Sequence, residues 1–310
     1  MRNFLGKNDF TWFFGVVEDR NDPVQLGRVR VRCYGWHTDD KDKIPTEHLP
    51  WAQVIQNVTS AAVSGKGTSP TGLVEGSWVI GFFLDGSRAQ EPVVMGSLAG
   101  IPENLADTTL GFNDPNGVYP LYTNESDVNK LSRGTNSITK TPDSIIGEPA
   151  SPYAAQYPKN HVYESESGHV VEIDDTANAE RIHIYHKSGT FIEMHPNGDV
   201  VTHHKNGFRT VTGNDKLHVT GDMDIYVDGN VNWNVTGDVT ENIEGNMDTN
   251  VTKNITTDGK TINLNSGVNG AARIGDTADT GDAGTGSHFD VNQAGTNIIE
   301  SGSATVFIGD

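Results

Sequence analysis

The chain has 310 residues, 35% of them apolar, and a net charge of −19. This acidic excess excludes nucleic acid and anionic membrane surfaces as partners, because like charges repel. Its single cysteine, Cys33, excludes a disulfide framework and predicts folding in a reducing cytoplasm, here that of the host. No apolar run reaches the roughly 18 residues of a membrane span, and the first residues do not resemble a cleaved signal peptide.

Residues 10–100 predict a compact all-β domain. The text FTWFFGVVEDRNDPVQLGRVRVRC contains two strand-like runs separated by an Asn-Asp-Pro turn. Three further runs, PWAQVIQNV, GSWVIGFFLDG and EPVVMGSLAG, follow, with Asp85-Gly86 as hairpin chemistry. Five short strands in this length favour a small Greek-key barrel of the OB type, and we assign residues 1–103 to it.

OB barrels also bind single strands of nucleic acid, so that alternative needs weighing. The chemistry would come from a basic stripe and stacking aromatics, namely Arg28, Arg30, Arg32, Trp12, Phe13 and Phe14. Acidic residues lie close by at Asp39, Asp40 and Asp42. We therefore expect the arginines on a solvated or protein-facing surface, the aromatics in the core, and no nucleic acid.

Four phrases in this domain carry a family resemblance: DPVQLGRVRV, LPWA, VEGSWV and EPVVMG. Together they resemble the N-terminal OB-fold domain of the central spike proteins of T-even-type contractile-tailed phages, and more distantly the VgrG spikes of type VI secretion. The resemblance implies that the barrel docks on a trimeric baseplate hub protein and through it on the tail tube.

Residues 104–160 are rich in Pro, Asn, Ser and Thr and show no sustained period, which predicts an extended linker or clasp. In the T-even spike family a lysozyme domain occupies this place. Glycoside hydrolysis needs a carboxyl pair in a structured cleft, and the acidic residues here are scattered. The sequence therefore predicts that the chain is not an enzyme and has no catalytic residues.

Residues 161–210 predict broader strands separated by turns at Gly168, Gly189, Gly198 and Gly207. The run SGHVVEIDDTANAERIHIYHKSGTFIEMHPNGDV resembles the opening of the β-helix of VgrG and phage spikes. Because Ile182 and Ile184 take one strand face, we expect His183 on the other face, exposed to solvent. A metal-ligand role for the histidines of this segment is the alternative reading.

Residues 211–255 repeat every eight residues. Each unit has a branched apolar residue two places before a glycine. The apolar positions are Val211, Val219, Val227, Val235, Ile243 and Val251, and the glycines are Gly213, Gly221, Gly229, Gly237 and Gly245. Apolar residues keep odd numbers throughout, so the period of two predicts strands with one buried face, and the glycines predict corners.

A single ribbon of this kind would leave an apolar stripe and open edges in water. Three intertwined copies would hide both, so the octads predict a homotrimeric β-helix over residues 161–265. The named apolar residues would form the trimer core. A monomeric β-helix is the alternative, but monomeric coils usually need about 20 residues or more per turn.

Residues 266–310 contain two phrases, AARIGD and SGSATVFIGD, that resemble one repeat of the PAAR proteins that cap such spikes. The resemblance implies a small β tip in which three chains share one point, through Arg273, Gly275, Asp276, Gly302, Val306 and Ile308. It also implies that three copies of His288 hold an Fe or Zn ion on the axis. Alternatives are an exposed His288, or Ca²⁺ on nearby aspartates.

The sequence as a whole predicts a structural spike of the virion, at the centre of a contractile tail baseplate. It would pierce the host outer envelope when the sheath contracts. The alternatives are a VgrG-class spike of type VI secretion and a receptor-binding tail fibre. A VgrG-class spike normally carries its hub domains before the barrel, and a fibre tip should present aromatic binding loops.

Overall fold

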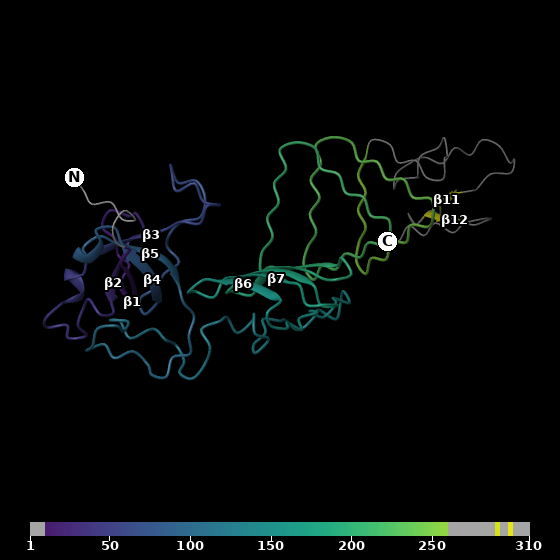
Figure 1. Ribbon diagram of the computed structural model, residues 1–310. Helices are drawn as coiled ribbons and strands as arrows, with labels where there is room; N and C mark the ends of the chain where they lie inside the picture. Colours follow the sequence, from purple (N-terminus) through teal and green to yellow (C-terminus); the bar gives the residue numbers. More distant parts are fainter. Residues whose placement is uncertain (1–9, 260–288, 292–296, 300–310) are drawn as a thin grey trace. The chain divides into compact units, whose positions relative to one another are not determined.

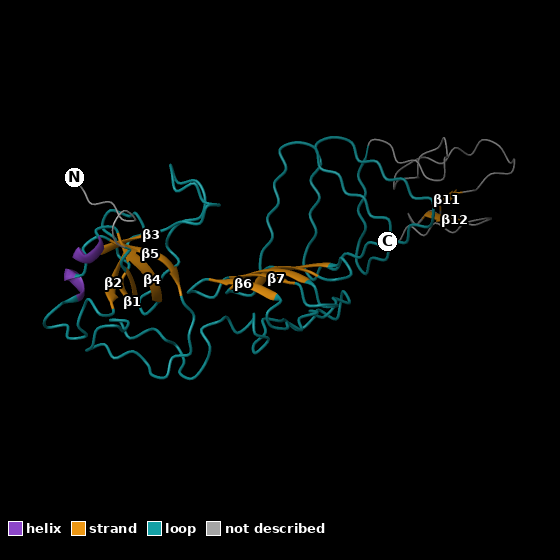
Figure 2. Cartoon of the chain, viewed as in Figure 1, coloured by secondary structure: helices purple, strands orange, loops and turns teal. Residues whose placement is uncertain are grey.

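The computed structural model describes residues 10–259, 289–291 and 297–299. Nearly all of its regular structure is β (Figure 2), and two short 3₁₀ turns, η1 (Thr46–His48) and η2 (Gly86–Arg88), complete it. Two compact units, residues 1–228 and 229–310, divide the chain inside the octad run. None of the helical segments in the described ranges has the length and apolarity that crossing a bilayer requires.

The N-terminal domain is a closed five-stranded barrel, which confirms the predicted OB-type fold (Figure 1). Its strands close in the order β1-β2-β3-β5-β4, with β3 and β5 parallel and the other pairs antiparallel. Their bounds are β1 (Trp12–Asp19), β2 (Val29–Cys33), β3 (Trp51–Val54), β4 (Trp78–Phe83) and β5 (Pro92–Ser97).

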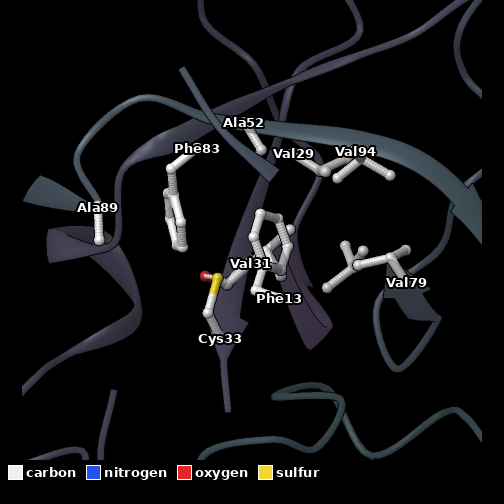
Figure 3. Packing of buried hydrophobic residues seen from close by; sticks show 10 residues of the cluster. Phe13, Val29, Val31, Cys33, Ala52, Val79, Phe83, Ala89 and Val94 are labelled. Carbon is white, nitrogen blue, oxygen red and sulfur yellow. Dashed lines mark hydrogen bonds between the residues drawn. The ribbon is translucent and has the colours of Figure 1, made fainter. Parts of the chain in front are cut away.

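The barrel interior is filled by inward-facing aliphatic and aromatic side chains. Figure 3 shows Phe13, Val31, Val79 and Phe83 meeting at its centre. The single cysteine, Cys33, is fully buried among them, and desolvation raises the pKa of its thiol. The thiol is therefore a packing group rather than a reactive one.

The expectation for the aromatics of β1 was wrong in part. Phe13 is in the core with 2% of its surface exposed, whereas Trp12 and Phe14 are 53% and 39% exposed. Period-two alternation explains the result, because neighbours along a strand point to opposite faces. Three adjacent aromatics cannot all enter one barrel.

The surface assignment of the arginines was also wrong for Arg32. Its side chain is fully buried and forms a bidentate ion pair with Glu18, with Nε at 2.6 Å and Nη2 at 3.0 Å from the carboxylate oxygens. The Arg32 guanidinium also donates to the carbonyl oxygens of Thr38 and Ile44. Arg32 thereby holds the loop after β2 on the barrel.

The same ion pair anchors the start of the linker. The backbone amide of Phe112 donates to Glu18 Oε1 at 2.7 Å, and Gly111 N donates to the Asp39 carbonyl at 2.7 Å. A Cβ at Gly111 would overlap the Arg32 guanidinium. Residues 104–114 are thus held on the barrel by a buried ion pair. The loop-like sequence of this segment does not predict that contact.

A Gly81→Ala substitution is expected to destabilise the barrel by about 1–3 kcal/mol through overpacking. An added Cβ would overlap the carbonyl oxygen of Val93 and lie 2.6 Å from Phe13 Cζ. Gly96, on the neighbouring strand β5, is the matched control, because its Cβ would meet no atom within 4 Å. Denaturation followed by barrel tryptophan fluorescence checks both. Equal denaturation midpoints for the two variants would contradict the close packing of Gly81 against Val93 and Phe13.

The second sheet lies in residues 160–203 and confirms strands where the sequence predicts them. Its antiparallel order is β10-β9-β8-β7-β6. The strands are β6 (Asn160–Glu164), β7 (Val170–Asp174), β8 (Arg181–His186), β9 (Thr190–Met194) and β10 (Val200–His203). Gly168, Gly189 and Gly198 have positive φ in the turns between them, as predicted.

The described part of the chain after β10 carries no assigned strand between residues 204 and 259, which Figure 2 draws as loop. Its backbone bends at regular intervals, at 212–213, 220–221, 228–229, 236–237, 244–245 and 252–253. Near the C-terminus, β11 (Phe289–Val291) pairs antiparallel with β12 (Asn297–Ile299).

Candidate functional site

The sheet β6–β10 exposes its apolar face and buries its charged face. On the exposed face two cross-strand rows run over the sheet, because the registered partners share a side. One row passes through Val171, Ile184 and Ile192, and the other through Ile173, Ile182, Met194 and Val200. These side chains are 40% to 59% exposed.

The opposite face holds a row of ionisable groups on three neighbouring strands. Glu172 on β7 is registered with His183 on β8, and His183 is registered with Glu193 on β9. All three residues are at most 2% exposed. His183 Nδ1 lies 3.0 Å from Glu172 Oε2, so a hydrogen bond joins β7 and β8 across this face.

The prediction that His183 is exposed is therefore wrong: 1% of its surface is accessible, against 42% for Ile182 and 51% for Ile184. The alternation was identified correctly, but the assignment of the faces was inverted. An apolar face is normally buried first. Here a segment of the same chain covers the polar face and leaves the apolar face bare.

Arg181 supplies the compensating charge beneath that segment. Its Nη2 lies 2.8 Å from Glu172 Oε1 and its Nη1 lies 3.2 Å from Glu193 Oε2. His195 Nε2 approaches the second oxygen of Glu193 at 2.9 Å. Buried carboxylates are stable only when paired in this way.

The covering segment is residues 128–156, which we call the strap. Leu131 of the strap is 2% exposed, and its carbonyl oxygen accepts hydrogen bonds from Asn160 Nδ2 and from the Tyr153 hydroxyl. Ser151 Oγ donates to Glu193 Oε2 at 3.1 Å, and the Tyr153 ring lies 4.8 Å from the Arg181 guanidinium carbon. The strap thus binds the charged network through hydrogen bonds and a cation–π contact.

A cavity of about 270 Å³ lies between the strap and the sheet, lined by Lys140, Glu148, His183, Glu193 and His195 among others. The metal alternative raised by the sequence concerns the histidines of residues 161–204, three of which line this cavity. Within the described ranges, no three His, Cys, Asp or Glu side chains are arranged to hold a metal ion.

The pKa of Glu172 makes the network sensitive to acid. Burial raises this pKa, but the hydrogen bonds from His183 and Asn160 and the charge of Arg181 outweigh burial, so it falls below its ordinary 4.5. A carboxyl with a lowered folded pKa stabilises the fold above pH 4.5, and the contribution is lost as the pH falls through the folded value.

Glu172→Gln is therefore expected to lower stability at pH 7 and to differ progressively less from the parent as the pH drops below 4.5. Thermal unfolding of both proteins between pH 3 and pH 7 measures this. Glu164, exposed on β6, offers the matched Gln control. A difference between Glu172→Gln and the parent that stays constant with pH would contradict the assignment.

The octad residues named as trimer core are all exposed in the single chain. Val211, Val219, Val227, Val235, Ile243 and Val251 have 45% to 52% of their surface accessible. Each backbone bend includes the glycine position of its octad, Gly213, Gly221, Gly229, Gly237 or Gly245, and the last bend includes Lys253. Burial of these residues between three chains stays a prediction.

The predicted tip residues lie outside the described residues. They are Arg273, Gly275, Asp276, His288, Gly302, Val306 and Ile308. The Fe or Zn ion implied for His288 depends on these residues. Its presence, like the shared point, stays a prediction from resemblance.

Comparison with known proteins finds similarity to the Gp5 proteins of two phages. A family model described as the Gp5 N-terminal OB domain matches residues 35–181. Protein Gp5 of Vibrio phage KVP40 is 42% identical over 280 residues, covering 72% of this chain and 66% of that protein. The pre-baseplate central spike protein Gp5 of Enterobacteria phage T4 is 48% identical over 132 residues, covering 41% and 23%. The match spans less than two thirds of either relative.

Proposed function

We propose, from the premise that this chain belongs to the Gp5 family of phage baseplate central spike proteins, that it is a homotrimeric, non-enzymatic spike. In this proposal the barrel docks on the baseplate hub protein and through it on the tail tube. The three C-terminal segments wind together and are driven through the host outer envelope when the tail contracts. The protein is then part of the virion.

The observation that carries the proposal is the bare apolar face of the sheet β6–β10. Its valine, isoleucine and methionine side chains have the composition of a domain core, yet they are exposed in one chain. Contiguous apolar surface of this kind marks an interface. The strap already fills the other face, and in this proposal further copies of the chain cover the apolar one.

The octads support the same arrangement beyond the sheet. Apolar residues keep one parity from 217 to 255, and a bend recurs every eight residues. Neighbouring chains would supply the backbone partners that these segments need for strand pairing. Every layer of such a spike requires all three chains, which gives the stiffness that penetration demands.

Two carboxylates in residues 101–159 are engaged in local contacts, which supports a non-enzymatic role. Glu125 accepts a hydrogen bond from Arg133 and pairs with Lys130, and these contacts lower its pKa. Asp127 Oδ2 accepts a hydrogen bond from Gly100 N at 2.9 Å. A glycosidase needs the opposite, a carboxyl with a raised pKa in a cleft. A turbidity assay on isolated cell walls tests this, and clearing would overturn it.

Mass measurement of the purified native protein tests the trimer. The expected species has three times the 33.5 kDa mass of one chain. A stable single subunit at micromolar concentration would overturn the proposal, because the apolar sheet face would then be exposed in solution.

A further inference from the structure

The barrel carries a row of partly exposed aromatic side chains along the outside of β1 and β4, with one member just before β1 and one just after β2. We call this row the aromatic strip. Its members are Phe10, Trp12, Phe14, Tyr34, Trp78 and Phe82. Phe10, Trp12, Tyr34 and Trp78 are 45% to 61% exposed. Exposed aromatics in a continuous row mark a protein interaction site, whereas single exposed ones need no explanation.

Register and ring contacts group the members of the strip at the two ends of the β1–β4 ladder. Trp12 on β1 is the registered partner of Phe82 on β4. The Phe10 and Phe82 rings lie 5.6 Å apart, and the Trp12 and Phe14 rings meet edge to face at 5.1 Å. At the other end Tyr34 stacks on Trp78 at 5.5 Å and, on the linker side, on Phe112 at 4.0 Å. The strip therefore follows the length of the β1–β4 ladder.

Charge excludes nucleic acid as the occupant. Residues 10–17 and 78–84 contain no charged side chain, and the chain carries −19 overall. The arginines in and just before β2 that could have contacted phosphates are engaged within the barrel: Arg28 pairs with Asp22, Arg30 with Asp19 and the buried Arg32 with Glu18. A single strand of nucleic acid needs free cations beside the stacking rings.

The Trp12 end of the strip is far along β1 from the contact between the barrel and the β6–β7 turn. β1 ends at Asp19, and the next residue, Arg20, forms a bidentate ion pair with Glu166 of the β6–β7 turn, at 2.7 and 3.0 Å. Trp12 lies at the opposite end of this eight-residue strand, about 26 Å away at roughly 3.3 Å per residue. Trp78, in contrast, is registered with Val16, four residues before Arg20, so the strip runs from this contact to the far end of β1.

We infer that the aromatic strip is the surface through which the barrel binds a second baseplate protein, one with an uncharged, apolar groove that accepts the Trp12 and Trp78 rings. The inference rests on the proposed function, which places the barrel against the baseplate. Buried Trp and Tyr anchors dominate the binding energy of protein interfaces, and charged residues are depleted from interface cores. The strip meets both conditions.

Photo-crosslinking in assembled tails tests the partner. The photoreactive residue p-benzoylphenylalanine replaces Trp12 in one protein, Trp78 in a second, and Ile145 of the strap, which is 64% exposed, in a control. We expect the proteins labelled at Trp12 and Trp78 to crosslink to the same protein, which is not this chain. We expect the protein labelled at Ile145 not to crosslink to it. Crosslinks only to another copy, none at all, or equal crosslinking at Ile145 would overturn the inference.

A double variant separates this inference from the trimer. Trp12→Ser with Phe14→Ser is expected to leave the native mass of the purified protein unchanged and to reduce its incorporation into tails at least about tenfold, as loss of aromatic anchors does. Val58→Ser, at a fully exposed loop residue, should incorporate like the parent. Normal incorporation of the double variant into tails would overturn only the inference that the aromatic strip binds a partner. A monomeric parent protein would overturn the proposed function.

Discussion

A Val235→Asp substitution is expected to leave the purified protein monomeric, whereas Asn234→Asp is expected to leave the trimer intact. Val235 has the odd parity of the octad apolar positions and is 52% exposed in one chain. On a threefold axis the substitution would bring three carboxylates together in an apolar interior, where unpaired charges are strongly unfavourable. Asn234 has even parity, so its new charge would face water.

Native mass spectrometry and sedimentation measure this outcome. The two variants differ by one position and introduce the same charge, so a general effect of added acid would appear in both. Dissociation of both variants would contradict the parity of the octads. Retention of the trimer in both variants would contradict the placement of Val235 at the threefold axis, because three buried carboxylates could not be accommodated there.

The sheet face gives an independent pair of variants for the same trimer. Ile184→Asp introduces a charge at the centre of the apolar face of β8, and Ile146→Asp introduces it on the exposed side of the strap, where the side chain is 62% exposed. Only the first should dissociate the trimer. The same readout for both would mean that the apolar face of β6–β10 is not what joins the copies.

The second large effect is expected in the barrel, where Arg32→Met should destabilise the domain by about 3–5 kcal/mol. Removing one partner of a buried ion pair leaves the other charge unpaired, here the Glu18 carboxylate with 2% exposure. Glu18 would retain only the hydrogen bonds from Thr46 Oγ1 and the Phe112 amide, both at 2.7 Å. The loop after β2 would also lose its two carbonyl contacts to Arg32.

Amide hydrogen exchange of β1 and β2 measures the loss within the barrel itself. Arg88→Met is the matched control, because Arg88 is exposed in η2 and such changes usually stay within about 0.5 kcal/mol. Similar exchange rates in the two variants would contradict a stabilising role for the Arg32–Glu18 pair. A tenfold or larger difference confirms it.

The sequence predicted the barrel because strand alternation and turn chemistry are local properties. Val29, Val31 and Cys33 alternate with arginines in β2, and the inward positions are the buried ones. Alternation cannot say whether an outward residue meets water or another segment. Arg32 points out of the barrel yet is fully buried, because residues 38–46 and 111–112 close over it.

The charged network is the clearest case of missing information. Glu172, His183 and Glu193 each stand between apolar residues in consecutive strands, so their shared face could be predicted from the sequence. Their burial could not be predicted, because it depends on the strap. The Pro- and Ser-rich sequence of the strap has no periodicity that would indicate which residues it covers. A row of ionisable residues aligned on three neighbouring strands was the available signal.

By itself, the sequence determined the all-β class, the barrel and the parity of the strands and octads, because each depends on residues close together in the chain. Only the tertiary structure decided which face of the sheet β6–β10 is covered, which arginine of β2 is buried and which aromatics of β1 remain exposed. Those outcomes depend on segments far apart in sequence, such as the strap and the loop at Phe112. Burial is a property of the neighbours that a residue meets after folding, and a local pattern does not contain them.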